Sequence, residues 1–169
     1  MLRKPRIAVA AGLALALGVG TAALAGGFEW HARPMIGANE VPAVASDAEA
    51  RASFEMDDGV IHYKLRMRKP IKQAFMAHIH AANVGVNGPI VVWLFGKPPA
   101  TSNPPIDFGR RAVVAEGDIH ATDLVGPLAG KTLDDLMALL NSGGAYVNMH
   151  TIAHPGGEIR AQVTSEEED

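Results

Sequence analysis

Hydrophobic and polar residues alternate along most of the chain, and a period of two is the pattern of half-buried β-strands. The alternation is cleanest over residues 48–56, where Ala, Phe and Met occupy one face and Glu, Arg and Ser the other. Asp57-Asp58-Gly59 follows, and Asp-Gly tolerates the positive φ angles of a tight hairpin turn. Residues 60–67 alternate in the same way. The two stretches therefore predict an antiparallel hairpin.

Further stretches predict strands on the same grounds. They cover residues 28–37, 73–81, 90–95, 110–116, 145–151 and 158–164. The stretch 90–95 is continuously apolar, as expected of a central strand. About eight short strands at hairpin-like spacing favour an all-β fold. We expect an antiparallel β-sandwich or Greek-key barrel.

One short helix is expected in a crossover between these strands. Thr132 and Asp135 have the spacing of a capping box, with Asp in place of the usual Glu or Gln. The apolar residues that follow at helical spacing are Leu133, Leu136, Met137 and Leu140. Gly143-Gly144 then predicts the end of the helix.

Residues 96–109 contain four prolines and predict a long loop. Loops of this length are unusual in compact domains and are often functional. If the protein works by binding a partner, we expect this loop to form the contact surface.

The first 25 residues have the pattern of a secretory signal peptide. Residues 1–6 are basic, and residues 7–25 are uncharged and end in Ala-Leu-Ala, an A-x-A cleavage motif. A retained membrane anchor is the alternative, because the run is about long enough to span a bilayer. We expect cleavage, a single domain over residues 26–164 in the periplasm or outside the cell, and an acidic, disordered tail over residues 165–169.

Charge and composition exclude several function classes. Removing the three basic residues of the predicted signal changes the formal net charge from −3 to −6. No basic run remains, so we expect neither a nucleic-acid binder nor a binder of anionic membranes. The chain has no cysteine, which excludes disulfides and thiolate ligands. Any metal must therefore be held by His, carboxylate or Met. The oligomeric state stays open.

Two histidines on one strand face are the main chemical signal. His78 and His80 are two residues apart, so their side chains lie on the same face of the predicted strand. The neighbours that we expect to face the core instead are Phe75, Ala77 and Ile79. His150 lies on the outward face of the stretch 145–151. Three neutral imidazoles suit Cu(II), Zn(II) or Ni(II), so these residues predict a metal site.

His154 and Arg160 are further candidates for this site. His154 follows His150 by four residues and precedes a Pro-Gly-Gly turn, so it is either a fourth ligand or an exposed turn residue. Arg160 shares the outward face of the last predicted strand and would attract a small anion to the metal. The alternative without a metal is that the histidines are solvated or hydrogen-bond across the sheet.

Five motifs together indicate a family. They are residues 37–42 (GANEVP), 77–92 (from AHIH to NGPIVV), 123–128 (DLVGPL), 146–151 (YVNMHT) and 154–162 (HPGGEIRAQ). Over about residues 28–164 the chain resembles the CHRD domain, which is named from chordin and is widespread in exported bacterial proteins. The resemblance implies an all-β fold. The family has no settled chemistry.

A looser resemblance, to copper/zinc superoxide dismutase, concerns the site. That enzyme is a β-sandwich with copper held by histidines on the outer sheet face and an arginine over the metal. The likeness implies that His78, His80 and His150 are copper ligands and that Arg160 guides the anion. The chain lacks the cysteines of the enzyme's disulfide and any His/Asp-rich zinc loop. It therefore supports at most a copper-only superoxide dismutase.

Three functions follow from these observations. The leading one is an exported copper-binding protein with superoxide dismutase-like redox activity. The second is a non-enzymatic extracellular binding module. The third is a zinc hydrolase or hydratase, because three histidines hold Zn²⁺ with an open fourth position. The chain contains no G-x-S-x-G, P-loop or H-E-x-x-H motif that would favour another chemistry.

Overall fold

The computed structural model describes residues 28–97 and 104–165. The predicted signal peptide and residues 166–169 of the predicted tail lie outside this part of the chain. Ser165, which the sequence analysis assigned to the tail, is the last residue of the final strand. No helix in the described ranges has the length and apolar character needed to cross a membrane.

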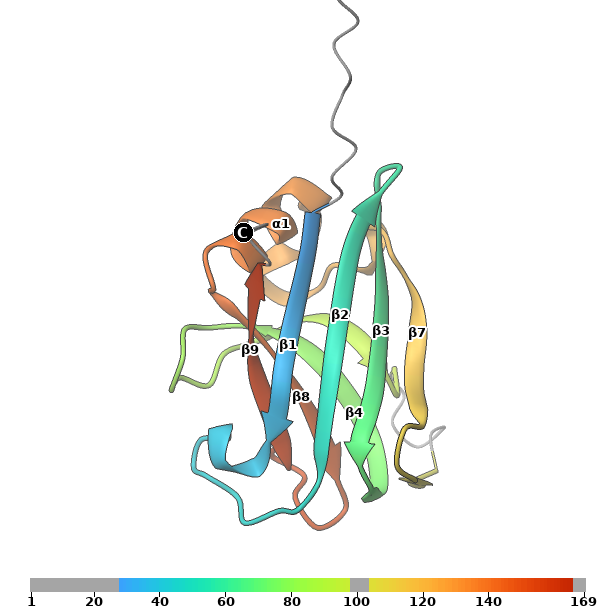
Figure 1. Cartoon of the computed structure of the whole chain (residues 1–169). Helices are drawn as coiled ribbons and strands as arrows, with labels where there is room; N and C mark the ends of the chain where they lie inside the picture. Colours follow the sequence, from blue (N-terminus) through green and yellow to red (C-terminus); the bar gives the residue numbers. More distant parts are fainter. Residues whose placement is uncertain (1–27, 98–103, 166–169) are drawn as a thin grey trace, which may run out of the picture.

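The described residues form nine strands and one α-helix, which lies at one end of the sheet (Figure 1). The strands are β1 Phe28–Ile36, β2 Glu49–Asp57, β3 Val60–Lys69, β4 Ile71–Ala81, β5 Ile90–Phe95, β6 Ile106–Phe108, β7 Val113–Ile119, β8 Ala145–Thr151 and β9 Ile159–Ser165. The helix, α1, spans Leu133–Asn141. Short 3-10 helices cover Gly37–Asn39, Ala121–Asp123 and Gly126–Leu128.

All strand pairs are antiparallel, and the sheet order is β5-β4-β8-β9-β1-β2-β3-β7, with β6 also paired to β4. The sheet curls until its end strands, β5 and β7, approach one another. Tyr63 of β3 donates a hydrogen bond of 2.8 Å to the carbonyl of Leu94 in β5 across this gap. The prediction of an all-β fold is confirmed, and the sheet forms a nearly closed antiparallel barrel.

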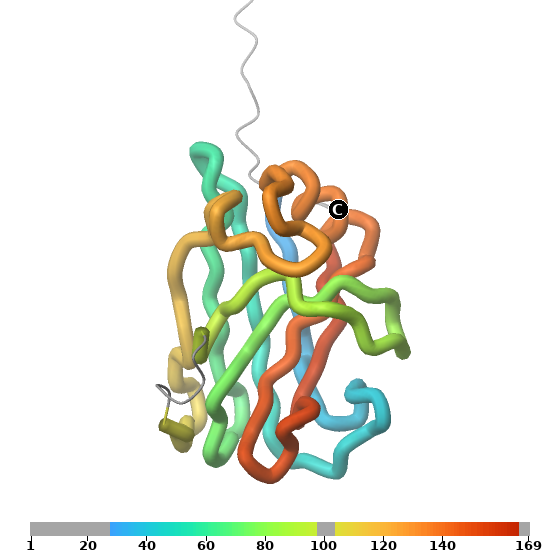
Figure 2. The backbone as a smooth tube through the Cα atoms, turned by 180° about the vertical axis from the view of Figure 1, so that it is seen from behind, coloured from blue at the N-terminus to red at the C-terminus, as the bar shows by residue number. Residues whose placement is uncertain are grey.

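The core fills the inside of the barrel with apolar side chains from every long strand. Their alternation with outward polar residues is the pattern that predicted the strands. The segments between β7 and β8, including α1, close one end of the barrel (Figure 2). Leu136 and Leu140 of α1 are fully buried there. Asn141 accepts a hydrogen bond of 2.7 Å from the indole nitrogen of Trp30, which ties the helix to β1.

The loop predicted over residues 96–109 is only partly described, because residues 98–103 lie outside the described ranges. Residues 106–108 form the short strand β6, which pairs with the first half of β4. The next strand, β7, begins at Val113 rather than at Arg110. Arg110 and Arg111 lie in a turn, and Arg111 has a φ of 67°, which no strand accommodates.

The prediction that Phe75 faces the core is wrong, because β4 is irregular before the histidines. Ala74 and Ala77 are both fully buried in the core although they are three residues apart. The register between β4 and β8 shifts at this point, as a β-bulge requires. Phe75 therefore lies on the histidine side of the sheet, with its ring centroid 6.5 Å from that of His150.

The capping box of α1 is confirmed and carries a prediction for stability. Thr132 Oγ1 accepts from the backbone N–H of Asp135 at 3.3 Å, and the Asp135 carboxylate accepts from the backbone N–H of Thr132 at 2.9 Å. We expect Thr132→Ala to lower the free energy of unfolding by about 1 kcal/mol, because the backbone N–H of Asp135 loses its acceptor. Urea denaturation measures the change. Thr132→Ser keeps the hydroxyl and should match the wild type; equal stability of the Ala variant would contradict the prediction.

Candidate metal centre

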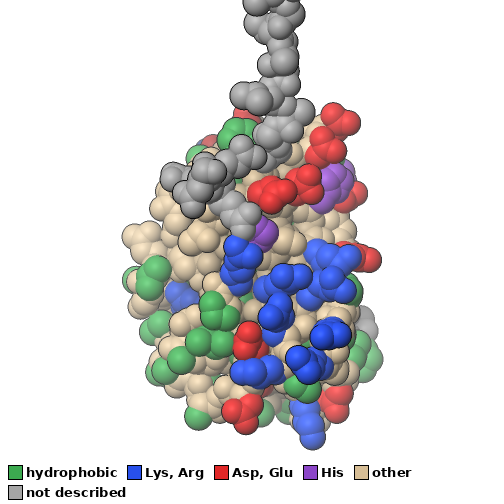
Figure 3. Space-filling model, viewed as in Figure 1, with side chains coloured by type: hydrophobic (Ala, Val, Ile, Leu, Met, Phe, Trp, Pro, Cys, Tyr) green, Lys and Arg blue, Asp and Glu red, His purple; other side chains and the backbone are tan. Residues whose placement is uncertain are grey.

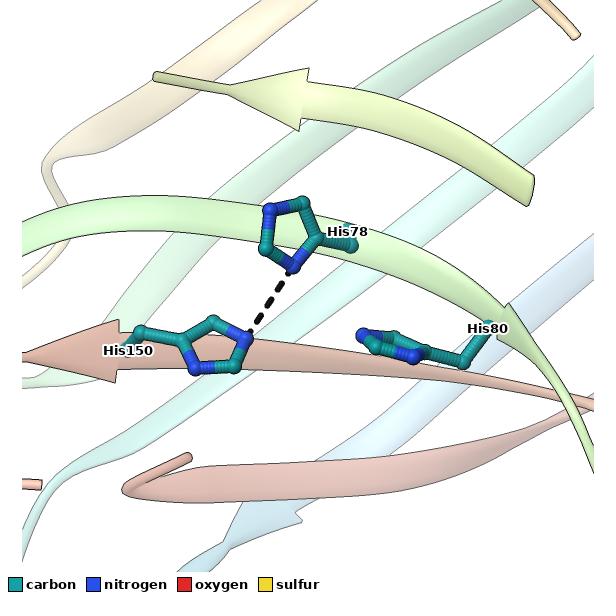
Figure 4. A group of neighbouring side chains, drawn as sticks. All are labelled: His78, His80 and His150. Carbon is teal, nitrogen blue, oxygen red and sulfur yellow. Dashed lines mark hydrogen bonds between the residues drawn. The ribbon is translucent and has the colours of Figure 1, made fainter. Parts of the chain in front are cut away.

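The structure brings three of the predicted ligands together. His78 and His80 project from β4, and His150 projects from the neighbouring β8 (Figure 4). One ligand atom from each of the three imidazoles lies within 4.8 Å of the others. In the antiparallel register His78 pairs with Asn148 and His80 with Tyr146, so all five side chains share the outer face of the sheet.

This outer face is covered, so the histidines are buried. The exposed fractions of His78, His80 and His150 are 1%, 8% and 6%. Trp93 of β5 packs edge-on against His78 with 4.2 Å between ring centroids. Tyr146 stacks on His80 at 4.7 Å with the planes 5° apart. The alternative of solvated strand histidines is therefore wrong.

Backbone carbonyls fix which ring nitrogens carry protons. His80 Nδ1 lies 2.8 Å from the carbonyl of Gly88, and His150 Nδ1 lies 2.9 Å from that of Pro155. A carbonyl only accepts, so both Nδ1 atoms donate and both Nε2 atoms of the neutral rings keep a lone pair. His78 Nδ1 lies 3.0 Å from His150 Nε2 and donates to it. Asn148 Oδ1 lies 3.0 Å from the same His150 nitrogen, but both atoms are acceptors in this tautomer, so the contact is not a hydrogen bond.

Two of the resulting acceptors are buried without a partner. His78 Nε2 and His80 Nε2 have no hydrogen bond to any described residue. Leaving a buried acceptor unpaired costs about 1–3 kcal/mol, so such atoms need an explanation. The ring of His80 points towards the other two imidazoles (Figure 4), where a bound cation would satisfy its free lone pair.

Burial keeps all three imidazoles neutral. Burial, with smaller contributions from the neighbouring His150 and His80, lowers the pKa of His78 to about 2. Burial also lowers the pKa of His150 and of His80, although their carbonyl partners oppose the shift. Metal ligation requires the neutral form, so the group is in its ligating state at neutral pH.

The structure does not bring His154 into this group. It lies in the turn after β8, where its backbone N–H donates to Thr151 Oγ1 at 3.1 Å. The group whose ligand atoms lie within 4.8 Å contains His78, His80 and His150.

Arg160 of β9 pairs with Asn148 of β8 and has an exposed fraction of 2%. Its guanidinium carbon lies 3.4 Å from the ring centroid of Tyr146, on whose ring His80 also stacks. It donates to Asn87 Oδ1 at 3.0 Å and to the carbonyl of Val86 at 2.7 Å. Its positive charge contributes to the lowered pKa of His80, so it lies within electrostatic range of the site.

Hydrogen bonds hold the loop of residues 82–89 over the side of the sheet that carries the histidines. Gln162 donates to the carbonyl of Ala82 at 2.8 Å, and Asn87 donates to that of Val41 at 2.7 Å. A Cβ on Gly88 would lie 2.0 Å from the carbonyl oxygen of Ala81, so the close approach requires glycine. Sequence reasoning treated this loop as a plain turn; its only signal was the NGP motif shared with the family.

Glu40 is a second functional candidate that sequence reasoning missed. Its exposed fraction is 6%, and its Oε1 has no hydrogen bond to a described residue. Burial raises the pKa of Glu40 to about 7, opposed by the charge of Arg160. Both residues line a cavity of about 460 Å³ beside the 82–89 loop. Gly157 beside the carboxylate has a φ of 131°, a backbone conformation that residues with a side chain rarely adopt, so glycine is favoured there.

The fold and site define a small antiparallel β-barrel with three buried histidines on the covered outer face of its sheet. The model of the CHRD domain family matches residues 32–163, and the chain belongs to this family. Searches of curated proteins and of solved structures found no match. The likeness to copper/zinc superoxide dismutase therefore rests on the histidine arrangement alone.

Glu40 gives a prediction for the pH dependence of stability. Its pKa is raised in the folded protein, so its stabilising contribution is full below the unfolded value of 4.5 and is lost as the pH rises through about 7. We expect the unfolding free energy of the wild type, minus that of Glu40→Gln, to fall by about 3 kcal/mol across this window. Urea denaturation of both proteins with a chelator present measures it. The histidines titrate in both proteins, so their contribution cancels when the two unfolding free energies are subtracted. A difference in unfolding free energy that does not change with pH would contradict the raised pKa of Glu40.

Proposed function

We propose that this protein is an exported CHRD-domain protein that binds one copper ion through His78, His80 and His150. The observation that carries the proposal is the unpartnered Nε2 of His80, which is buried and points towards two further neutral imidazoles. A set of three nitrogen donors of intermediate softness suits Cu(II). Zinc fits the same donors and is the alternative ion. Family membership and the predicted signal peptide support export.

We propose further that the site has superoxide dismutase-like activity. When bound, copper supplies one-electron chemistry between Cu(II) and Cu(I). The carbonyls of Gly88 and Pro155 accept from Nδ1 of His80 and His150, which orients both rings and leaves the proton off Nε2. The Nε2 of His80 is unpartnered, whereas that of His150 accepts from His78 Nδ1 and would have to exchange this bond for the metal. Arg160 places a positive charge within electrostatic range of His80. This charge would attract a small anion, which the net-negative protein otherwise repels.

Membership of the CHRD family favours a second function, an extracellular binding module without turnover. The histidines would then serve the structure. His80 links β4 to the 82–89 loop through Gly88, and His150 links β8 to the following turn through Pro155. Measurements of copper binding and of superoxide turnover distinguish the two functions.

Copper binding is tested with tag-free protein. We expect one equivalent of Cu(II) to give an electron paramagnetic resonance spectrum with nitrogen hyperfine structure. His80→Gln should weaken copper binding by at least about tenfold. Removing a residue that only supports a metal ligand already costs about 10–100-fold in affinity, and this variant removes a ligand itself. His62→Gln is the matched control, because His62 is exposed and bonds Asp118. Thermal melting establishes that each variant is folded.

The outcomes of this titration are distinct. An unchanged spectrum in His80→Gln would remove the proposed site, and wild-type protein that fails to bind copper at micromolar concentration would favour the binding module. Stoichiometric zinc in protein purified from medium containing both metals would reassign the ion.

Turnover is tested on the copper-loaded protein. We expect Arg160→Gln to slow superoxide consumption about tenfold at low salt and to flatten its salt dependence, because the steering charge is lost. Lys131→Gln makes the same charge change at an exposed residue near α1 and should leave the rate unchanged. The copper spectrum of both variants must match the wild type for this comparison. A copper-loaded wild type that does not consume superoxide would contradict the redox proposal and leave copper binding intact.

A further inference from the structure

Five arginines gather on the outer face of the barrel, away from the histidines. They come from β2, from β3 and from the turn before β7, and with Met67 they line a cleft of about 240 Å³. They are Arg51, Arg66, Arg68, Arg110 and Arg111. Figure 3 shows basic side chains clustered over this part of the sheet. We call this group the arginine cleft.

The backbone assembles the cleft from three separate parts of the chain, at residues 51, 66–68 and 110–111. The register of β2 and β3 places Arg51 opposite Arg66. Backbone hydrogen bonds from Arg111 to Met67 at 3.1 Å and from Met67 to Ala112 at 2.9 Å hold the turn against β3. Because the cations are brought together by strand pairing, composition and net charge gave no sign of them.

The arrangement is unfavourable for folding. Like charges directly opposite each other in an antiparallel pair are destabilising. Elsewhere on this face the cross-strand partners are complementary, as in Lys64 with Glu116 and His62 with Asp118. Among the described residues, no ion pair involves Arg51, Arg68, Arg110 or Arg111.

A second unfavourable feature lies at the same place. Arg111 has a φ of 67°, in the left-handed region that side chains other than glycine seldom adopt. Local strain and unpaired charge that coincide are typical of functional sites, where binding compensates the cost.

The chemistry of the cleft points to phosphate or sulfate groups. The planar guanidinium fork matches these oxyanions with paired hydrogen bonds. The cleft is smaller than the roughly 300–1,000 Å³ of pockets for drug-sized ligands, so it fits a charged group rather than a whole small molecule.

The cationic surface extends beyond one anionic group. A second cleft of about 420 Å³ shares Arg51 and Arg68 with the first and adds Arg33 of β1. Its lining also includes Glu49, whose carboxylate pairs with Lys69 at 3.0 Å. A ligand that fills both must carry several anionic groups along its length. No aromatic side chain lines either cleft, so neither offers a stacking surface for nucleic-acid bases.

The other end of the same face is acidic. A third cleft there is lined by Glu29, Glu55, Glu116 and Asp118, together with His31 and His62. Figure 3 shows acidic and histidine side chains at this end and basic ones at the other. The acidic end would repel a polyanion and confine it to the arginines. We propose that the arginine cleft binds the sulfate or phosphate groups of an anionic polysaccharide.

The test uses the full mature chain and fluorescein-labelled dextran sulfate, with neutral dextran as the uncharged control. Fluorescence polarisation should show saturable binding to dextran sulfate that weakens steeply with salt, because condensed counterions are released on binding. We expect Arg51→Gln combined with Arg66→Gln to weaken binding at least tenfold. Lys64→Gln combined with Lys131→Gln makes the same charge change outside the cleft and should weaken it less than twofold.

Stability separates loss of the site from loss of the fold. Removing two opposed like charges should leave the melting temperature of the arginine double variant equal to or above that of the wild type. Equal weakening by the two double variants would overturn the proposal, since binding would then follow net charge alone. Tighter binding to vesicles containing phosphatidylglycerol, to a single-stranded oligonucleotide or to free inorganic phosphate would likewise overturn the assignment to a polysaccharide.

Discussion

The site depends on the exclusion of water from one outer face of the barrel. Strand histidines normally face solvent, but here Trp93, Tyr146 and the 82–89 loop cover them. Without water, each imidazole nitrogen must find a protein partner or another ligand. That single constraint explains the carbonyl contacts of His80 and His150 and the neutral state of the rings, and it makes the two unpartnered nitrogens costly.

The cover is held by a connected set of polar contacts that joins distant strands. Arg160 of β9 bonds the loop through Asn87 and stacks on Tyr146, on which His80 also stacks. Removing one member leaves others buried without a partner, so the contributions are not additive. Glycine at position 88 is needed because the loop approaches β4 too closely for any side chain.

The fold was predictable because its rules are local. Alternation located the long strands, and the Thr132–Asp135 spacing located the helix. The bulge that turns Phe75 away from the core was not predictable, since it depends on pairing with β8. For the site, the two-residue period of a strand predicted that His78, His80 and His150 lie on outward faces. Glu40, Asn87 and Gly88 were not predicted, because they lie in loops and the position of a loop depends on tertiary packing. The arginine cleft was not predicted, because the pairing of β2 with β3 and the turn before β7 bring its members together from separate parts of the chain.

The two tryptophans of the chain occupy contrasting places. Trp93 lies with its ring 4.2 Å from His78, while Trp30 is fully buried on β1 and bonded to Asn141 of the helix. A paramagnetic ion among the histidines would quench the emission of the first far more than that of the second. The molecule thus carries an intrinsic fluorescent reporter at the site and an internal reference at the helix, so occupancy and folding have separate optical readouts without any added label.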